Sequence, residues 1–309
     1  MNIHIENLTK KYGAQRAVDS ISMEVNTGEI LGFLGPNGAG KTTTMKMITG
    51  YLKMDEGEIL IGGKSIAEEA EEIKKHIGYL PENTPMYNEM PVIDYMEFCA
   101  ALQGVPNEMM PERVREMIRI CGLNQEKHKR IGELSKGYKQ RVGLAQAMIH
   151  DPDILILDEP TTGLDPNQIV EIRSLIRDLG KEKTVILSTH ILPEVEATCD
   201  RILIINKGKI VADGTAESLR NKSQGHKLYR VAIEEAEPNV IFNALQELPS
   251  VTSVDFSDRK QNRLDVQCAQ NQSAARDIFQ LCVKNNWVLT ELTPIETKLE
   301  DIFRNLTMN

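Results

Sequence analysis

Runs of consecutive apolar residues mark buried strands in the first two thirds of this chain. Residues 30–34, 154–157 and 184–187 are almost entirely apolar, and polar turns bound each run. Strands that are apolar along their whole length are buried on both faces, which is typical of a parallel sheet covered by helices. Helical patterns at 42–48 and after residue 165 alternate with these runs. The pattern therefore predicts an α/β fold for residues 1–218.

Between residues 92 and 130, a second pattern that is helical throughout interrupts this alternation of strands and helices. Apolar residues recur there at spacings of three and four and predict one buried helix face, made by Val92, Tyr95, Met96, Cys99 and Leu102. Breaks fall at 104–106 and at Gly122. With the helix that opens after Ser135, these segments predict a helical subdomain over about residues 84–150.

From residue 219 onward the elements become shorter and change order. We expect strand 227–233, helix 238–247, strands 251–256 and 263–268, helix 272–284, strand 287–293 and helix 296–306. The first six follow the order β-α-β-β-α-β, which is that of a ferredoxin-like fold. The polar segment 221–225 is the expected linker. Residues 219–309 are thus predicted to form a small α+β accessory domain without a catalytic constellation.

Composition and charge exclude several classes of protein. The chain has 309 residues and a formal net charge of −9, which argues against a nucleic-acid partner because phosphate neutralisation needs clustered Lys and Arg. No apolar run approaches the ~18 residues of a membrane span, and the N-terminus lacks a signal peptide pattern, so we expect a cytoplasmic protein. The five cysteines form no C-x-x-C pair and predict reduced thiols.

Residues 35–42 match the pattern G-x-x-x-x-G-K-[ST] between a predicted strand and a predicted helix. In that context glycines curl the backbone so that N–H groups face phosphate oxygens. Lys41 is then expected to reach the β- and γ-phosphates of ATP, and Thr42 to ligate Mg²⁺. A plain glycine turn is the weaker alternative. The predicted nucleotide-binding residues are Gly35, Pro36, Asn37, Gly38, Ala39, Gly40, Lys41, Thr42 and Thr43.

Polar residues follow two of the buried runs. Asp158 and Glu159 end one of them, and the pair predicts a metal-positioning carboxylate beside a base for the attacking water. The alternative is a solvated loop start. His190 ends the next run, where it is either a hydrogen-bonding partner of the γ-phosphate or a structural histidine. Tyr12 is either an aromatic platform for adenine or an ordinary exposed loop residue.

The segments GPNGAGKTT, LSKGY, ILILDEP, TGLDP and STH, in this order, resemble the ATP-binding subunit of an ABC transporter over residues 2–218. The resemblance implies that Tyr12 stacks on adenine and that His190 is the switch histidine. It also implies that Ser135 and Gly137 belong to the signature that binds the γ-phosphate of the other subunit. Asp165 matches the loop that crosses the dimer interface.

The resemblance implies a P-loop NTPase fold with an antiparallel β-subdomain and a helical subdomain. It further implies ATP hydrolysis, a polytopic membrane permease as partner, and a dimer with a second copy or a paralogue, peripheral to the inner face of the cell membrane. A soluble ABC-type ATPase acting on ribosomes or nucleic acid is the alternative. A non-hydrolysing scaffold is disfavoured by Glu159. The cargo stays open.

Two positions depart from the family pattern. Lys136 and Tyr138 replace the usual Gly and Gln of the signature, and Glu82 stands where the family usually has Gln. Lys136 either adds positive charge near the trans phosphate or faces water, and Glu82 either weakens ATP binding or binds Mg²⁺ more firmly. These departures resemble a branch of gliding-motility, multidrug and polysaccharide exporters. In the wider family the permease docks close to residues 82–100. The second domain is either a regulatory module or a dimerisation or stability element.

Overall fold

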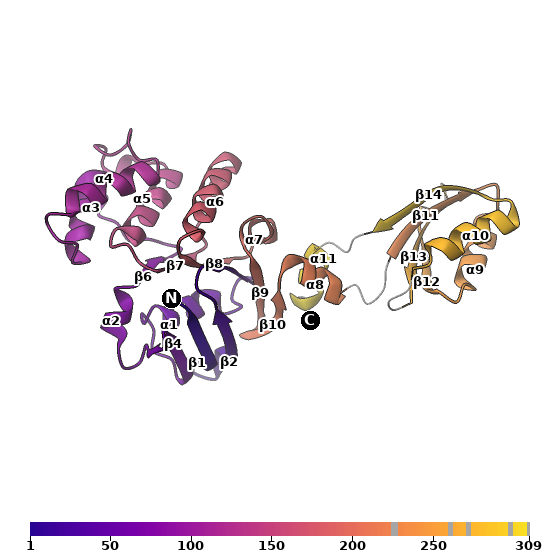
Figure 1. Cartoon of the computed structure of the whole chain (residues 1–309), viewed down its shortest axis with the longest axis horizontal. Helices are drawn as coiled ribbons and strands as arrows, with labels where there is room; N and C mark the ends of the chain where they lie inside the picture. The colour runs from indigo at the N-terminus through magenta and orange to yellow at the C-terminus, as the bar shows by residue number, and fades with distance from the viewer. Residues whose placement is uncertain (224–227, 259–261, 270–272, 296–298, 308–309) are drawn as a thin grey trace. The chain divides into compact units, whose positions relative to one another are not determined.

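The computed structural model describes residues 1–223, 228–258, 262–269, 273–295 and 299–307. The chain divides into two compact units, Met1–Thr215 and Ala216–Asn309, which are coloured from indigo to yellow in Figure 1. Among the described residues, no helix is long and apolar enough to span a bilayer.

A six-stranded sheet forms the centre of the first unit, in the order β10-β9-β3-β8-β7-β6. The five strands from β9 to β6 run parallel, and β10 pairs antiparallel with β9 through the turn at Lys207-Gly208. The strands are β3 (Ile30–Leu34), β6 (Ile77–Leu80), β7 (Ile154–Asp158), β8 (Thr184–Thr189), β9 (Arg201–Asn206) and β10 (Lys209–Gly214). The apolar runs thus form the central strands, as predicted.

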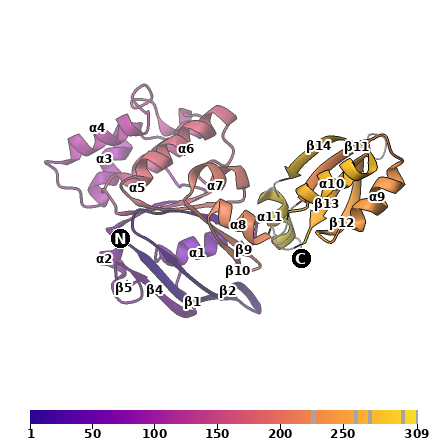
Figure 2. The same cartoon turned by 45° about the vertical axis from the view of Figure 1, so that its right-hand side comes forward.

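Alternate residues of the central strands face two different cores. Ile154 and Ile156 pack with helix α1 (Lys41–Ile48) and with an antiparallel sheet in the order β2-β1-β4-β5. That sheet consists of β1 (Ile3–Tyr12), β2 (Gln15–Val25), β4 (Glu56–Ile61) and β5 (Lys64–Ser65). Leu155 and Leu157 pack instead with the helices on the opposite face. Figures 1 and 2 show the antiparallel sheet below the central sheet and these helices above it.

The predicted helical subdomain is present between β6 and β7. It contains α3 (Val92–Leu102), α4 (Met110–Ile120), the short 3₁₀ helix Ile131–Glu133 and α5 (Lys136–Met148). The remaining helices of the unit are α2 (Ala70–Lys74), α6 (Pro166–Gly180) and α7 (Leu192–Thr198). Of the predicted apolar face, Leu102 was wrong. Its side chain is 71% exposed because α3 ends there and its last turn reaches beyond the core.

The second unit contains a four-stranded antiparallel sheet in the order β12-β13-β11-β14. Together with helices α9 (Pro238–Gln246) and α10 (Ala275–Asn285), this sheet forms the predicted ferredoxin-like arrangement. The elements are α8 (Ala216–Ser223), β11 (Leu228–Glu234), α9 (Pro238–Gln246), β12 (Val251–Asp258), β13 (Arg263–Cys268), α10 (Ala275–Asn285), β14 (Val288–Ile295) and α11 (Leu299–Thr307). The predicted linker 221–225 was wrong at 221–223, which continue α8, and its last two residues lie outside the described residues.

Candidate functional site

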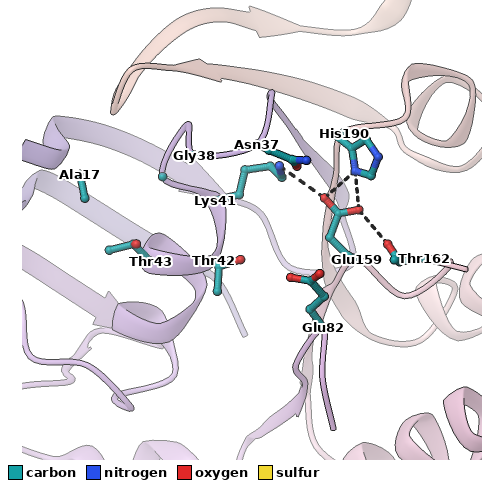
Figure 3. A pocket seen from close by; sticks show the side chains of 11 residues that line it. Ala17, Asn37, Gly38, Lys41, Thr42, Thr43, Glu82, Glu159, Thr162 and His190 are labelled. Carbon is teal, nitrogen blue, oxygen red and sulfur yellow. Dashed lines mark hydrogen bonds and ion pairs between the residues drawn. The ribbon is translucent and has the colours of Figure 1, made fainter.

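A cavity of about 390 Å³ lies where β3, β7 and β8 end. Register pairs Leu34 with Thr189, and Asp158 with Ser188, so the carboxyl ends of three strands meet at one edge of the sheet. Such an edge is where α/β sheets place their ligands. The residues that line the cavity, most of them labelled in Figure 3, are Ala17, Asn37, Gly38, Gly40, Lys41, Thr42, Thr43, Glu82, Glu159, Thr162 and His190.

The loop between β3 and α1 needs its glycines for two different reasons. A Cβ at Gly35 would lie 2.5 Å from the carbonyl oxygen of Ile205, and one at Gly40 would lie 2.5 Å from that of Ala17. Gly38 has a φ of +78°, but a Cβ there would meet no atom within 4 Å. The first two glycines are therefore needed because backbone packs closely against backbone there. Gly38 is needed for its positive φ, which strains other residues, and it faces the open cavity. Helix α1 starts without a side-chain cap, so its free N–H groups can bind an anion.

Lys41 is buried at the centre of the site, with 7% of its surface exposed. Its ammonium group donates hydrogen bonds to the carbonyl oxygens of Gly35 (2.8 Å) and Pro36 (3.3 Å). It also lies 3.3 Å from Oε1 of Glu159. These contacts fix the ammonium group between the glycine-rich loop and the end of β7, which is the position needed to hold a phosphate at the helix terminus.

Glu159 makes hydrogen bonds and an ion pair to three side chains of the cavity (Figure 3). Besides Lys41, Oγ1 of Thr162 donates to its Oε2 at 3.3 Å, and Nδ1 of His190 lies 2.9 Å from the same oxygen. Because a carboxylate only accepts, the imidazole carries its proton on Nδ1 in this contact. The Glu159 backbone has a φ of +52°, an uncommon conformation for a residue other than glycine. This arrangement can orient a water molecule and take up its proton.

Asp158 has one oxygen without a partner. Oγ of Ser188 donates to its Oδ1, while Oδ2 is buried and accepts no hydrogen bond from any described residue. Burial first, and the Asp158 charge second, raise the pKa of the nearby Tyr79 hydroxyl. In the part of the chain that the structure describes, no three His, Cys, Asp or Glu side chains group together as a metal site. Asp158 does not line the cavity, but a buried carboxylate oxygen without a partner suits Mg²⁺, which takes few protein ligands and completes its shell with phosphate and water oxygens.

Several of the predicted site residues lie outside this cavity. Pro36 and Ala39 shape the loop without lining it. Tyr12 ends β1 and is 53% exposed. Oγ of Ser135 accepts the backbone N–H of Tyr138 at the start of α5, and neither Tyr12 nor Ser135 lines the cavity. Gly35, also a predicted binding residue, does not line it either.

The signature segment contacts α6 and the turn before it instead. A Cβ at Gly137 would lie 2.5 Å from Cδ of Gln168, and one at Gly163 would lie 2.2 Å from Nζ of Lys136. Asp165 caps α6 by accepting the N–H groups of Asn167 and Gln168. The Lys136 side chain therefore lies over the turn that follows Glu159 in the same chain, and the signature and Asp165 form a second cluster away from the cavity.

Sequence reasoning missed two residues that line the cavity. Thr162 follows Glu159 by three positions in a turn, a spacing at which a hydroxyl can reach back to the carboxylate, so its signal was present. Ala17 comes from β2 and carries no chemical signal at all.

Comparisons with known proteins decide the family. A profile of the family described as ABC transporter matches residues 18–162. The chain is 34% identical over 302 residues to the uncharacterized ABC transporter ATP-binding protein YxlF of Bacillus subtilis (strain 168), covering 97% of this chain and 98% of that protein. This chain belongs to the ABC transporter ATP-binding proteins. It is also 32% identical over 308 residues to the linearmycin resistance ATP-binding protein LnrL of the same organism, covering 99% and 98%.

A solved structure described as an ATP-binding subunit of an ABC transporter matches with a TM-score of 0.66 and 30% identity, covering 72% of this chain and 93% of that chain. The predicted ABC ATPase fold is thereby confirmed. As a member of this family the chain is an ATP hydrolase that powers transport, it binds ATP, and its family implies dimerisation and a membrane permease as partner.

Proposed function

We propose that the cavity at the ends of β3, β7 and β8 binds ATP with Mg²⁺ and that Glu159 is the catalytic base. The observation that supports this assignment most strongly is the convergence of Lys41, Thr162 and His190 on one Glu159 carboxylate. Lys41 and the N–H groups at the start of α1 bind the β- and γ-phosphates. Glu159 orients the attacking water and accepts its proton.

The Mg²⁺ ion would be held by Thr42 and Asp158, with Glu82 at the cavity wall as a further oxygen donor. When bound, the ion neutralises the negative charge of the phosphates. Nδ1 of His190, hydrogen-bonded to Glu159, keeps the imidazole ring at the edge of the cavity. In that position the ring positions the base and can reach the γ-phosphate.

The second half of the site comes from another subunit in this proposal. Ser135, Gly137 and Asp165 form their own cluster and line no part of the cavity. The 13-residue helix α5 begins there with free N–H groups and a serine hydroxyl, which suits a phosphate. A second copy or a paralogue would present this helix start to the ATP, and Tyr12 would stack on adenine. ATP then joins the two subunits, and hydrolysis releases them.

A second cavity, of about 380 Å³, suits the permease. It lies between the central sheet and the helical subdomain, and Tyr51 at its rim is 77% exposed. The lining residues are Thr49, Tyr51, Lys74, Ile77, Tyr79, Gln103, Gln146, Ala147 and His150. We place the docking of a polytopic permease here, so that closure of an ATP-bound dimer moves the membrane partner; none of the lining residues belongs to the expected region 82–100. Tyr51→Arg should abolish binding to the permease, whereas Val240→Arg on α9, with 52% exposure, should not.

Export is the proposed direction of transport, and the inner face of the cell membrane the proposed location. The support is the similarity to the linearmycin resistance protein over almost the full length of both chains, second unit included. The acidic balance of −9 disfavours nucleic acid as a partner.

The test is affinity purification of tagged Glu159→Gln protein from detergent-solubilised membranes with ATP, followed by mass spectrometry. We expect a polytopic membrane protein in stoichiometric amount. Recovery of ribosomes or nucleic acid without a membrane protein would refute the exporter proposal and favour a soluble ABC-type ATPase. Tyr51→Arg in the same background separates permease binding from ATP binding, because its ATP affinity should be unchanged.

A further inference from the structure

Two loop segments carry the reactive groups of the cavity and leave the sheet side by side. Glu159 follows β7, and His190 follows β8. The backbone N–H of Glu159 donates to the carbonyl oxygen of Ser188 at 2.9 Å, so the segments are already joined at their bases. Any change in their separation would alter the contact between the Glu159 carboxylate and the imidazole.

Glu194 on α7 joins the same two segments behind the cavity. Its carboxylate is buried, with 2% of the residue exposed. Oγ1 of Thr161 donates to Oε1 at 2.5 Å, and Oγ1 of Thr189 donates to Oε2 at 2.8 Å. The Thr189 hydroxyl in turn accepts the N–H of Ile191 at 3.1 Å. Both threonines are buried, so this network is almost completely shielded from bulk water.

The network is costly for a purely structural element. Within the described part of the chain, Glu194 forms no ion pair, and its hydrogen-bond donors are two neutral hydroxyl groups. Burying a carboxylate without a cation costs several kcal/mol in general, and apolar side chains would fill the same space at lower cost. The arrangement is therefore better explained by what it positions than by what it adds to stability.

We propose that Glu194 is a positioning residue for ATP hydrolysis, which rests on the proposed role of Glu159. Thr161 lies two residues after Glu159, and Thr189 immediately precedes His190. The two oxygens of the Glu194 carboxylate, each bonded to one threonine, therefore fix the distance between Glu159 and the His190 imidazole. Glu159 needs such support because its φ of +52° persists only where surrounding contacts determine it.

The matched variants are Glu194→Gln and Thr198→Val. Gln has the same shape but replaces one acceptor by a donor, so one of the two threonine bonds is lost or reversed. Thr198 lies on the same helix, and its buried hydroxyl has no hydrogen-bond partner among the described residues, so Val there changes no contact of the network. Thr161→Val and Thr189→Val remove the two donors singly.

The experiment measures kcat and KM for ATP with the purified full chain, together with the ¹⁵N NMR resonances of the His190 ring. Misplacing reacting groups by about 1 Å can cost about 100-fold in rate, so we expect Glu194→Gln to lower kcat by about 10- to 100-fold. KM should stay within twofold, because Glu194 touches no cavity residue that contacts ATP. The His190 resonances should shift, and Thr198→Val should change neither readout.

Thr161→Val should lower kcat in the wild-type background and have little further effect in Glu194→Gln, because the two side chains act through one bond. Wild-type kcat and unshifted His190 resonances in Glu194→Gln would overturn the proposal, even if its thermal stability fell. If the wild-type chain did not hydrolyse ATP, the proposed function would be refuted instead. The His190 resonances of the variants would then still test whether Glu194 positions the imidazole.

Discussion

Gly38→Ala separates two roles of a P-loop glycine, a left-handed backbone conformation and open space for phosphate, because Gly28 provides a matched control. Gly38 and Gly28 have the same φ of +78°, and a Cβ at either would meet no atom within 4 Å. Alanine in a left-handed conformation costs about 1–2 kcal/mol, and the cost should be similar at both positions. Only Gly38 lines the cavity, so only there does the new methyl group point toward the space proposed for phosphate.

The cost of alanine and the stabilisation by ATP can both be expressed as shifts in Tm. In a unit the size of Met1–Thr215, 1 kcal/mol corresponds to about 2–4 °C in Tm, so each variant should melt about 2–8 °C lower. ATP at 100 times its Kd adds about 2.7 kcal/mol, which is about 5–11 °C. Wild type and Gly28→Ala should keep that shift, and Gly38→Ala should lose most of it.

The assay is differential scanning fluorimetry of the full chain with and without ATP and Mg²⁺. Equal loss of stability without nucleotide checks that the backbone strain is matched. An ATP-induced shift in Gly38→Ala as large as that in Gly28→Ala would refute the reasoning, because the methyl group would then lie outside the phosphate site.

Three further substitutions test individual groups. Lys41→Ala should abolish ATP hydrolysis and weaken ATP binding, measured by calorimetry, because it removes the ammonium group at the loop; normal turnover would contradict the phosphate-binding role. Glu159→Gln should keep ATP binding, slow hydrolysis by about 10²- to 10⁴-fold and accumulate an ATP-dependent dimer in light scattering; a monomer with ATP would contradict the two-subunit site. Glu82→Gln removes one exposed charge from the cavity wall and should raise the Mg²⁺ concentration needed for half-maximal hydrolysis; an unchanged Mg²⁺ dependence would make this residue neutral.

Local sequence features were sufficient for the elements that form the cavity. The glycine-rich loop matches a complete motif within eight positions, so residues 35–42 could be read directly, although the approach of Gly35 to Ile205 and of Gly40 to Ala17 could not. The strands β7 and β8 are apolar on both faces, so their burial and the position of Asp158 and Glu159 at a strand end also followed from the sequence. The register that brings Asp158 beside Ser188 did not, because parallel pairing is set by the whole sheet.

Contacts between distant segments escaped the sequence analysis. The bond from Thr161 to Glu194 spans 33 positions, and neither residue type at its position distinguishes a buried acceptor from a surface side chain. The alternatives for Lys136 were a charge near the phosphate of the other subunit or a side chain that faces water. Lys136 is exposed, and the contact of its side chain with Gly163 could not be read from the sequence. Helix α8 was missed at 221–223 because a polar, Ser- and Lys-containing segment can continue a helix whose apolar residues come earlier.

One short segment connects the two halves of the proposed site. Residues 159–165 begin with the proposed catalytic base and end with the cap of α6, and the Lys136 side chain lies over Gly163 between them. Thr161, in the same segment, bonds to Glu194. Thr161 is buried, whereas Gly163 and Asp165 are exposed, so the contacts with Glu194 and Lys136 and the cap of α6 hold this segment more than burial does. We expect the signature at the start of α5 to respond through these contacts to the state of the proposed base in its own chain. Through the second subunit it would carry that information to the other ATP.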